Sequence, residues 1–536
     1  MVATLTLNRP SMMKRSSWMP ERPPLKMKAG DPIRHHELGA GKVIGFVRGG
    51  RIVRVEFEEI PGTRWEIPLE EIEVLSSKTD SPGSPQKKRA PRPKKKPEKD
   101  SFASDKPEST PREKPAEGVD PDSVSITAHQ AIEALRLGVV PSFHLDTYTV
   151  GRDMELYVIL RDLESAAENG GLRVVLGDYG TGKTHFLEMA ELLALEKGFL
   201  STRATLDSRE VMADRPRRIY NMLAGGIRYP DDPTLERRGL GPLLRKAVGD
   251  LNLIRRWNRK SHSDYHPYLA PALFYMAVLP SIEKGDDLEE RLVDWIEGSE
   301  VASNMELEDR LRSMTGVRKR LYALKDFRTV THLYTLILGG IAELARQVGY
   351  KGLAIMVDEA EFYSVLRGRD RTFSDILFKT FAAACLPASM LRFDPDGLPR
   401  GGQAIHQSFA YRYGENQPLY CIFALTHDPD GKLLLEKALP AERFIELKHF
   451  DSTDYVILSN RVLSLYALAD SGFAPGRDLS SLMAKVIEPC HLHGLIENPR
   501  QALKFITEIV DITRHCPDKL KPTLRNLERR LNATGR

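Results

Sequence analysis

Eight consecutive residues combine glycines, a lysine and a hydroxyl in a spacing that binds phosphate groups. They are Gly177-Asp178-Tyr179-Gly180-Thr181-Gly182-Lys183-Thr184, of the form G-x-x-x-x-G-K-[ST]. Glycines in such a loop let backbone N–H groups turn toward the phosphates of a nucleotide. We expect Lys183 to contact the β- and γ-phosphates and Thr184 to ligate Mg²⁺. The octapeptide therefore predicts binding of ATP or GTP together with Mg²⁺.

The segments on either side of the octapeptide are those that a phosphate-binding loop needs. Residues 172–176 (LRVVL) indicate a short buried strand that enters the loop, and residues 185–190 (HFLEMA) begin a helix that leaves it. The N-terminus of that helix adds partial positive charge beside the phosphates. This context of strand, loop and helix makes the motif more specific than the eight residues alone.

Two carboxylates follow a second apolar run. Residues 353–357 (LAIMV) show no alternation, which fits a strand buried on both faces of a parallel sheet. Asp358 and Glu359 come directly after it, at the edge where open α/β sheets bind their ligands. We expect Asp358 to hold Mg²⁺ and Glu359 to polarise the attacking water, with Glu361 as the next candidate base. The alternative is an acidic strand end before a helix cap, which the upstream loop disfavours.

Further strand and helix patterns extend these motifs into an α/β domain. Residues 199–204, 420–427 and 443–447 indicate additional strands, and most of the chain between the first of these and Asp358 is helical in pattern. We predict a P-loop α/β domain with a parallel sheet over residues 121–450, with a helical insertion at about 230–345. Residues 451–536 are predicted to form a C-terminal helical domain.

Residues 31–76 predict a small SH3- or Tudor-like β-barrel. Strand patterns lie at 42–46, 51–57 and 64–67. Residues 30–35 (GDPIRH) and 39–43 (GAGKV) resemble the Tudor-like modules of CarD-type transcription factors. That resemblance implies contact with RNA polymerase or another protein.

The segments that flank this module are basic. Residues 1–30 carry six Lys/Arg and one Glu, and residues 77–119 carry twelve Lys/Arg against seven Asp/Glu, in a chain whose net charge is only +4. The rest of the chain is therefore net negative. We expect a disordered tail at 1–30 and a Pro/Lys-rich linker at 77–120, both attractive to DNA through counterion release. A solvated spacer fits the linker's composition equally well.

Composition argues for a protein of a reducing cytoplasm. The four cysteines, Cys385, Cys421, Cys490 and Cys516, are scattered, which does not suit a disulfide framework. No run of 18 or more apolar residues occurs, so a membrane partner is not expected.

Residues 121–530 resemble AAA+-type ATPases of the Orc/Cdc6 neighbourhood and, more closely, the BrxC/BrxD-type ATP-binding proteins of BREX phage-defence systems. Four stretches carry the closer resemblance: 131–138 with Val140-Pro141, 150–152, 177–187, and 349–353 running into 358–361. The barrel and the basic linker depart from that family pattern. The resemblance implies ATP and Mg²⁺ as ligands, other defence-system proteins as partners, and a homo-oligomer.

The resemblance also implies roles for residues outside the two motifs. Val150-Gly151-Arg152 is expected near the adenine, and His185 is counted among the nucleotide-binding residues. Thr426, or His427 beside it, is expected to be the sensor that positions the attacking water. Arg500 is expected to touch the γ-phosphate from the C-terminal helices. Arg443, with Arg412 as the alternative, is the candidate arginine finger that acts on a neighbouring subunit.

Two functions from different classes fit these features. The first is a Mg²⁺-dependent ATPase that acts on DNA in antiviral defence. The second is a nucleotide-gated scaffold whose N-terminal module docks RNA polymerase or another protein, with ATP as a conformational ligand. Turnover stimulated by DNA favours the first, and slow turnover with a stable protein complex favours the second.

Overall fold

The computed structural model describes residues 4–6, 32–35, 39–47, 52–57, 64–68, 72–74 and 121–534, apart from 142, 207–211, 233, 235, 283–285, 300–303, 327–328, 361–367 and 402–407. The chain divides into two compact units, Met1–Ser123 and Val124–Arg536. The predicted linker at 77–120 and all of the predicted tail except Thr4–Thr6 lie outside the described residues.

The first unit contains a six-stranded sheet. Its strands are β1 (Thr4–Thr6), β2 (Pro32–His35), β3 (Gly39–Val47), β4 (Ile52–Phe57), β5 (Arg64–Pro68) and β6 (Ile72–Val74). The order is β1-β5-β4-β3-β2-β6, and every pair is antiparallel except β1 with β5. The tail predicted to be disordered thus contributes one short strand, because the edge of β5 offers unpaired backbone groups. The barrel remains a prediction.

The second unit is built on a parallel five-stranded sheet, which confirms the predicted α/β class. Its strands are β7 (Gly171–Gly177), β8 (Leu200–Thr205), β9 (Leu353–Asp358), β10 (Leu419–Thr426) and β11 (Phe444–Glu446). The order is β11-β7-β10-β9-β8, with all neighbours parallel. Strand β10 therefore has two neighbours: β7, which leads into the phosphate-binding loop, and β9, which ends in Asp358.

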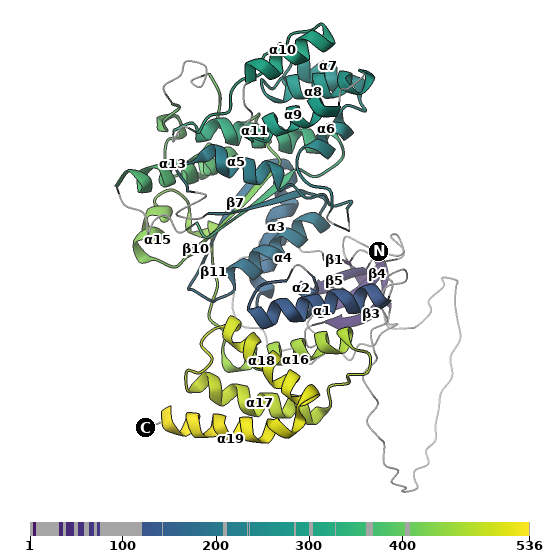
Figure 1. Cartoon of the computed structure of the whole chain (residues 1–536), viewed down its shortest axis with the longest axis vertical. Helices are drawn as coiled ribbons and strands as arrows, with labels where there is room; N and C mark the ends of the chain where they lie inside the picture. The colour runs from purple at the N-terminus through teal and green to yellow at the C-terminus, as the bar shows by residue number, and fades with distance from the viewer. Residues whose placement is uncertain are drawn as a thin grey trace, which may run out of the picture. The chain divides into compact units, whose positions relative to one another are not determined.

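Helices cover both faces of this sheet (Figure 1). The helices α3 (Asp153–Asn169) and α4 (Lys183–Glu196) pack on one face, and α5 (Pro216–Gly225), α11 (Thr331–Gln347) and α13 (Gly368–Cys385) pack on the other. Val175 and Ile422 point into the first core, and Val174 and Phe423 into the second. Burial on both faces explains why the strands show no polar alternation.

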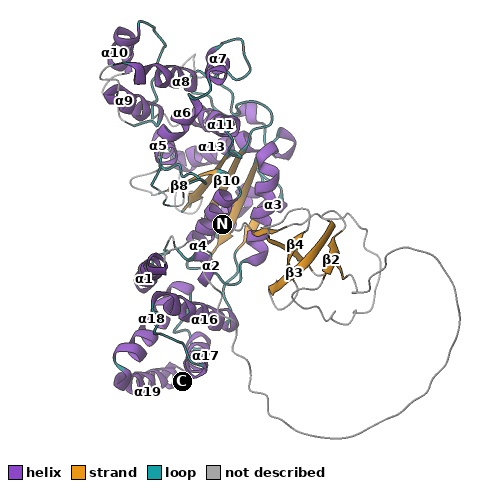
Figure 2. Ribbon diagram, turned by 90° about the vertical axis from the view of Figure 1, so that its right-hand side faces the viewer, coloured by secondary structure: helices purple, strands orange, loops and turns teal. Residues whose placement is uncertain are grey.

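The predicted helical insertion lies between β8 and β9. Its helices gather at one end of the second unit, as Figure 2 shows: they are α6 (Gly241–Ala247), α7 (Leu251–Asn258), α8 (Leu269–Val278), α9 (Asp286–Ile296) and α10 (Asn304–Thr315). The last helix of the predicted insertion, α11, differs because its apolar surface contacts β9 and β10 and forms part of the sheet's covering layer.

The C-terminal region is a helical bundle. It contains α16 (Ser452–Ala469), α17 (Arg477–Leu492), α18 (Pro499–His515) and α19 (Pro517–Thr534). Its core also includes residues from α1 (Pro121–Leu137) and α2 (Leu145–Tyr148). The predicted boundary at 450 therefore differs from the packing: residues 121–148 precede the sheet in sequence, but their apolar face, including Ile132 and Leu135, is buried in the bundle.

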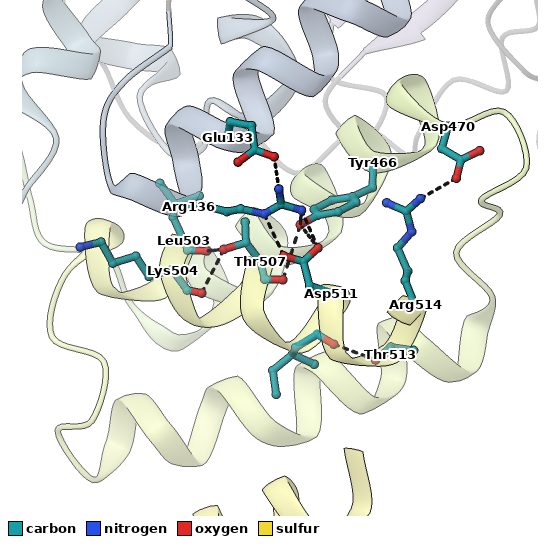
Figure 3. Close-up of polar contacts among 11 residues, drawn as sticks. Glu133, Arg136, Tyr466, Asp470, Leu503, Lys504, Thr507, Asp511, Thr513 and Arg514 are labelled. Carbon is teal, nitrogen blue, oxygen red and sulfur yellow. Dashed lines mark hydrogen bonds and ion pairs between the residues drawn. The ribbon is translucent and has the colours of Figure 1, made fainter. Parts of the chain in front are cut away.

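A polar network ties α1 to α18 (Figure 3). The Arg136 guanidinium donates to both carboxylate oxygens of Asp511, at 2.8 and 2.7 Å, and pairs with Glu133 on its own helix. The Tyr466 hydroxyl donates to Asp511 at 2.9 Å. The bidentate geometry fixes the orientation of α1 on the bundle as well as its position.

Across the described residues, no helix has the length and apolar character that crossing a membrane requires.

Candidate nucleotide-binding site

A cavity of about 460 Å³ lies in the second unit. Its walls come from the phosphate-binding loop, the end of β9, residues 135–152, Phe450, Leu458 and the first turns of α18. Arg152, Arg500, Asp358 and Glu359 all line this cavity, as predicted site residues. So do seven predicted residues in and just after the loop: Tyr179, Gly180, Thr181, Gly182, Lys183, Thr184 and His185. Gly177 and Asp178 lie outside the lining.

The loop has the backbone that its glycines predict. Gly180 and Gly182 have φ values of 84° and 90°, in the left-handed region that favours glycine. Gly182 is the N-cap of α4, so Lys183 and Thr184 stand in the first turn of that helix. The helix N-terminus therefore faces the cavity with the N–H groups of its first turn.

Lys183 and the candidate sensor Thr426 are in direct contact. Lys183 Nζ donates to Thr426 Oγ1 at 3.1 Å and to the carbonyl oxygens of Gly177 and Asp178 at 3.0 and 3.3 Å. The contact follows from the sheet, because Thr426 is aligned with Gly177 on the neighbouring strand. His427, the alternative sensor, is exposed, and its backbone N–H donates to Gly177.

Asp358 and Glu359 end β9 at the same edge of the sheet. Asp358 is 3 % exposed, and one of its carboxylate oxygens accepts a hydrogen bond from the Glu359 N–H at 2.9 Å. Glu359 is exposed and has φ of 52°, a left-handed conformation that costs a non-glycine residue roughly 1–2 kcal/mol. Glu359 itself lines the cavity, whereas the next residue, Ala360, is buried in the apolar core. Glu361 lies outside the described residues.

The residues present fit Mg²⁺ held jointly by protein and nucleotide. No cluster of three or more His, Cys, Asp or Glu suited to a metal occurs in the described part of the chain. Thr184 and Asp358 both line the cavity. One hydroxyl and one carboxylate, completed by phosphate oxygens and water, is the usual protein share of a Mg²⁺ site in nucleotide enzymes.

Arg152 holds the loop from behind. Its side chain is buried, and Nη2 donates to the carbonyl oxygens of Thr181 at 2.8 Å and Lys448 at 2.7 Å. The guanidinium also lies over the Phe450 ring, 5.1 Å from its centroid. Burial lowers the pKa of Arg152, against the opposing charges of Glu155 and Asp454. These contacts make Arg152 a positioning residue for the loop, whereas its predicted closeness to adenine remains a prediction.

His185 forms part of an aromatic and apolar wall. Its Nε2 lies 2.8 Å from Thr149 Oγ1, and its ring lies 5.1 Å from that of Tyr148. Its Nδ1 is buried and has no hydrogen-bond partner among the described residues. Burial, with the nearby charge of Arg152, lowers the pKa of His185 to about 4, so the imidazole is neutral at pH 7. A planar, neutral wall of this kind suits a nucleobase better than a phosphate.

The loop also contacts the C-terminal bundle. An added Cβ on Gly180 would lie 2.7 Å from the Asn498 Cβ, at the N-cap of α18. Arg500 Nη1 donates to the Tyr179 hydroxyl at 3.3 Å. The Asp178 carboxylate lies 2.7 Å from His449 Nε2. Arg500 therefore lines the cavity beside the tip of the loop, and its contact with the γ-phosphate remains a prediction.

The two candidate arginine fingers lie away from this cavity. Arg443 precedes β11, whose first residue is aligned with Val174, so it stands toward the amino end of the sheet, near Met390 Sδ at 2.9 Å. Arg412 donates to the Glu415 carbonyl oxygen at 2.5 Å, and burial lowers its pKa. Neither residue is among those that line the cavity of its own chain. A role in a neighbouring subunit remains a prediction.

Sequence reasoning missed Phe450, Asn498 and the neighbouring His449. Each lies more than 250 residues from the loop, and none belongs to a motif. The one available signal was the Asn498-Pro499 pair, which is a typical helix start. Helix chemistry alone does not show that this start would meet Gly180.

A parallel sheet with a G-x-x-x-x-G-K-T loop at the end of one strand and an acidic strand end nearby defines the class of P-loop-like α/β proteins. Within that class, residues 125–236 match the model of the family described as BREX system ATP-binding protein BrxC/D. The matched segment includes β7, the loop, α4 and β8, and confirms the predicted similarity there. Comparison with curated proteins and with solved structures gave no significant match.

Proposed function

We propose that this protein is a Mg²⁺-dependent ATPase of the AAA+ type that acts on DNA in BREX-like antiphage defence. The observation that supports it best is the contact between Lys183 and Thr426 at the edge that also carries Asp358 and Glu359. A loop that only bound a phosphate would not need a hydroxyl and two carboxylates converging from β9 and β10. The description of the matching family as ATP-binding supports ATP as the nucleotide.

The residues divide the chemistry among themselves. Lys183 and the backbone N–H groups of the loop would hold the β- and γ-phosphates. Thr184 and Asp358 would hold Mg²⁺, which supplies positive charge against the phosphate oxygens. The Glu359 carboxylate would accept a proton from the attacking water, and the Thr426 hydroxyl would orient that water. The apolar wall of Tyr148, Val150 and Phe450 would take the adenine.

Assembly belongs to the same proposal. Arg443, or Arg412, would act on the nucleotide of a neighbouring copy, since neither reaches its own cavity. Hydrolysis would then depend on a homo-oligomer, because an arginine finger contributes about 10³–10⁵ in rate.

A second function, a nucleotide-gated scaffold, is favoured by the contacts between the loop and the bundle. Gly180 with Asn498 and Tyr179 with Arg500 connect the phosphate-binding loop to α18 without any catalytic step. Nucleotide binding alone would then change how α18 docks on the loop, and the N-terminal module would present the outcome to RNA polymerase or another protein.

The deciding experiment compares steady-state ATP hydrolysis by the wild-type protein, Glu359→Gln and Glu361→Gln, with and without double-stranded DNA. We expect Glu359→Gln to bind ATP normally and to lose about 10²–10⁴ in turnover, the usual share of a general base. A loss confined to Glu361→Gln would move the base to that residue. Binding without turnover in any wild-type condition would favour the scaffold.

A further inference from the structure

A second cavity, of about 390 Å³, lies between α13 and the end of α15 (Pro429–Glu436). Its walls carry four basic side chains against a single carboxylate, and one aromatic ring: they are Arg371, Lys379, Arg392, Lys437, Asp375 and Phe393. Outside the tail and the linker the chain is net negative, so four cations around one hollow are a local concentration of charge.

Two of the four cations are already engaged within the protein. Lys379 Nζ pairs with Asp375 at 2.6 Å, and Arg392 Nη1 donates to the Glu436 carbonyl oxygen at 2.9 Å. Arg371 and Lys437 make no ion pair with any described residue. Lys437 is exposed and Arg371 is half-buried. The cavity therefore offers uncompensated positive charge at two points, supported by two cations of fixed position.

The walls of this cavity are connected to the strands of the candidate catalytic site. Arg371 stands in the first turns of α13, which begins nine residues after Glu359. Lys437 is the C-cap of α15, which begins three residues after Thr426. A ligand that bridges α13 and α15 would thus act on the segments that follow both β9 and β10.

We propose that this cavity binds phosphate groups of DNA. Two uncompensated cations next to two positioned ones complement the closely spaced charges of a phosphate backbone, and such contacts carry most sequence-independent affinity. The inference deepens the proposed function, on which it rests, because it supplies a DNA contact within the ATPase unit itself. That contact is separate from the basic tail and linker.

The test measures DNA binding by the full chain without nucleotide, so that it does not depend on the phosphate-binding loop. Arg371→Glu/Lys437→Glu is compared with Arg255→Glu/Lys260→Glu, which makes the same charge change at α7 and the residues after it. Fluorescence anisotropy with labelled duplex DNA is recorded over a series of salt concentrations. The tail and linker are present in every protein and give a constant background.

We expect the cavity variant to bind DNA at least about tenfold more weakly, with a salt slope smaller by about two, since each lost phosphate contact removes about one. The control should match the wild type.

Equal DNA binding by the two variants would overturn the proposal. A second contrary outcome is that the wild-type protein binds inorganic pyrophosphate at this cavity while the cavity variant keeps its affinity for DNA, which would indicate a small-anion site. ATP binding by the cavity variant should remain normal. Lys183→Ala should lose ATP binding and keep DNA binding, which would show that DNA binding at this cavity does not depend on the nucleotide site.

Discussion

At the residue scale, the site depends on a few side chains whose partners are known. Lys183 is the cation that the loop motif assigns to the phosphates, and its Nζ donates to Thr426 Oγ1 and to two carbonyl oxygens. These partners point the ammonium group along the loop, so it needs little rearrangement to meet a phosphate.

Lys183→Ala should reduce ATP affinity by at least about 100-fold, because it removes the main positive charge facing the phosphates. Binding of a fluorescent ATP analogue measures the effect. Lys197→Ala is the control, since Lys197 lies at the other end of α4 and pairs with Glu164. Unchanged ATP affinity in Lys183→Ala would show that residues 177–184 do not bind the phosphates of ATP.

Acidic pH should act through His266, three residues before α8 begins. The histidine is fully buried; Nδ1 accepts from the Tyr268 and Leu269 N–H groups, and Nε2 lies 3.3 Å from the Leu336 carbonyl oxygen. Burial lowers the pKa of His266 to about 3, against an opposing hydrogen bond to Leu336. The unfolded chain, with an ordinary histidine pKa near 6.5, therefore binds the proton more readily than the folded protein.

Its contribution to stability is complete above about pH 6.5 and falls as the pH drops toward 3. At pH 5 the loss is about 2 kcal/mol. Urea unfolding at pH 7 and pH 5 measures it. His266→Asn keeps an acceptor for the two N–H groups and should show a smaller difference between the two pH values. An equal difference would assign the acid sensitivity to other groups.

At the element scale, the loop and the start of α18 are packed against each other. Gly180 has φ of 84° and lies close to Asn498, whereas Gly182 has φ of 90° with nothing near its missing Cβ. Alanine at either position therefore strains the backbone, but only alanine at position 180 also meets a neighbouring side chain.

Gly180→Ala should weaken ATP binding more than Gly182→Ala, because only the first forces α18 away from the loop. Gly180→Ala/Asn498→Gly should recover part of the lost affinity, since glycine at an N-cap costs only a few tenths of a kcal/mol. Calorimetry with ATP measures all three proteins. Equal losses without recovery would show that φ strain alone matters.

The attachment of α1 to the bundle is a separate element-scale feature. Arg136 and Tyr466 both bond Asp511, while Arg514 on the same helix pairs with Asp470 and does not contact α1 (Figure 3). Both pairs are partly exposed, so each contributes modestly to stability.

Asp511→Ala should loosen α1 and increase hydrogen exchange over residues 128–137, with a loss of about 1 kcal/mol in local stability. Arg514→Ala is the matched control and should leave exchange in α1 unchanged. Equal exchange of α1 in both variants would show that apolar packing alone holds this helix.

At the scale of the whole molecule, the sheet order decides which motifs meet. Because β10 lies between β7 and β9, Thr426 stands between the loop and Asp358, although in the sequence it follows the end of the loop by 242 residues and Asp358 by 68. The helical insertion lies away from this edge of the sheet, between β8 and β9, so its length does not disturb the site.

Local spacing determined the chemistry of the site. A run of eight residues specifies the loop because glycine conformations, a lysine and a hydroxyl must be adjacent to surround a phosphate. Continuous apolar runs likewise specified buried strands, and the predicted parallel sheet was found. Asp358 and Glu359 were predictable because a strand end is a local feature.

Only the tertiary structure decided which distant segments complete the site. Packing joined α1 and α2 to the bundle, brought Phe450 and Asn498 to the loop, and left Arg443 and Arg412 outside the cavity. These outcomes depend on burial of apolar faces between segments far apart in sequence, and neither spacing nor composition specifies which face will meet which. The candidate residues are therefore recognised from local sequence, whereas the walls of the cavity that they line are set by packing.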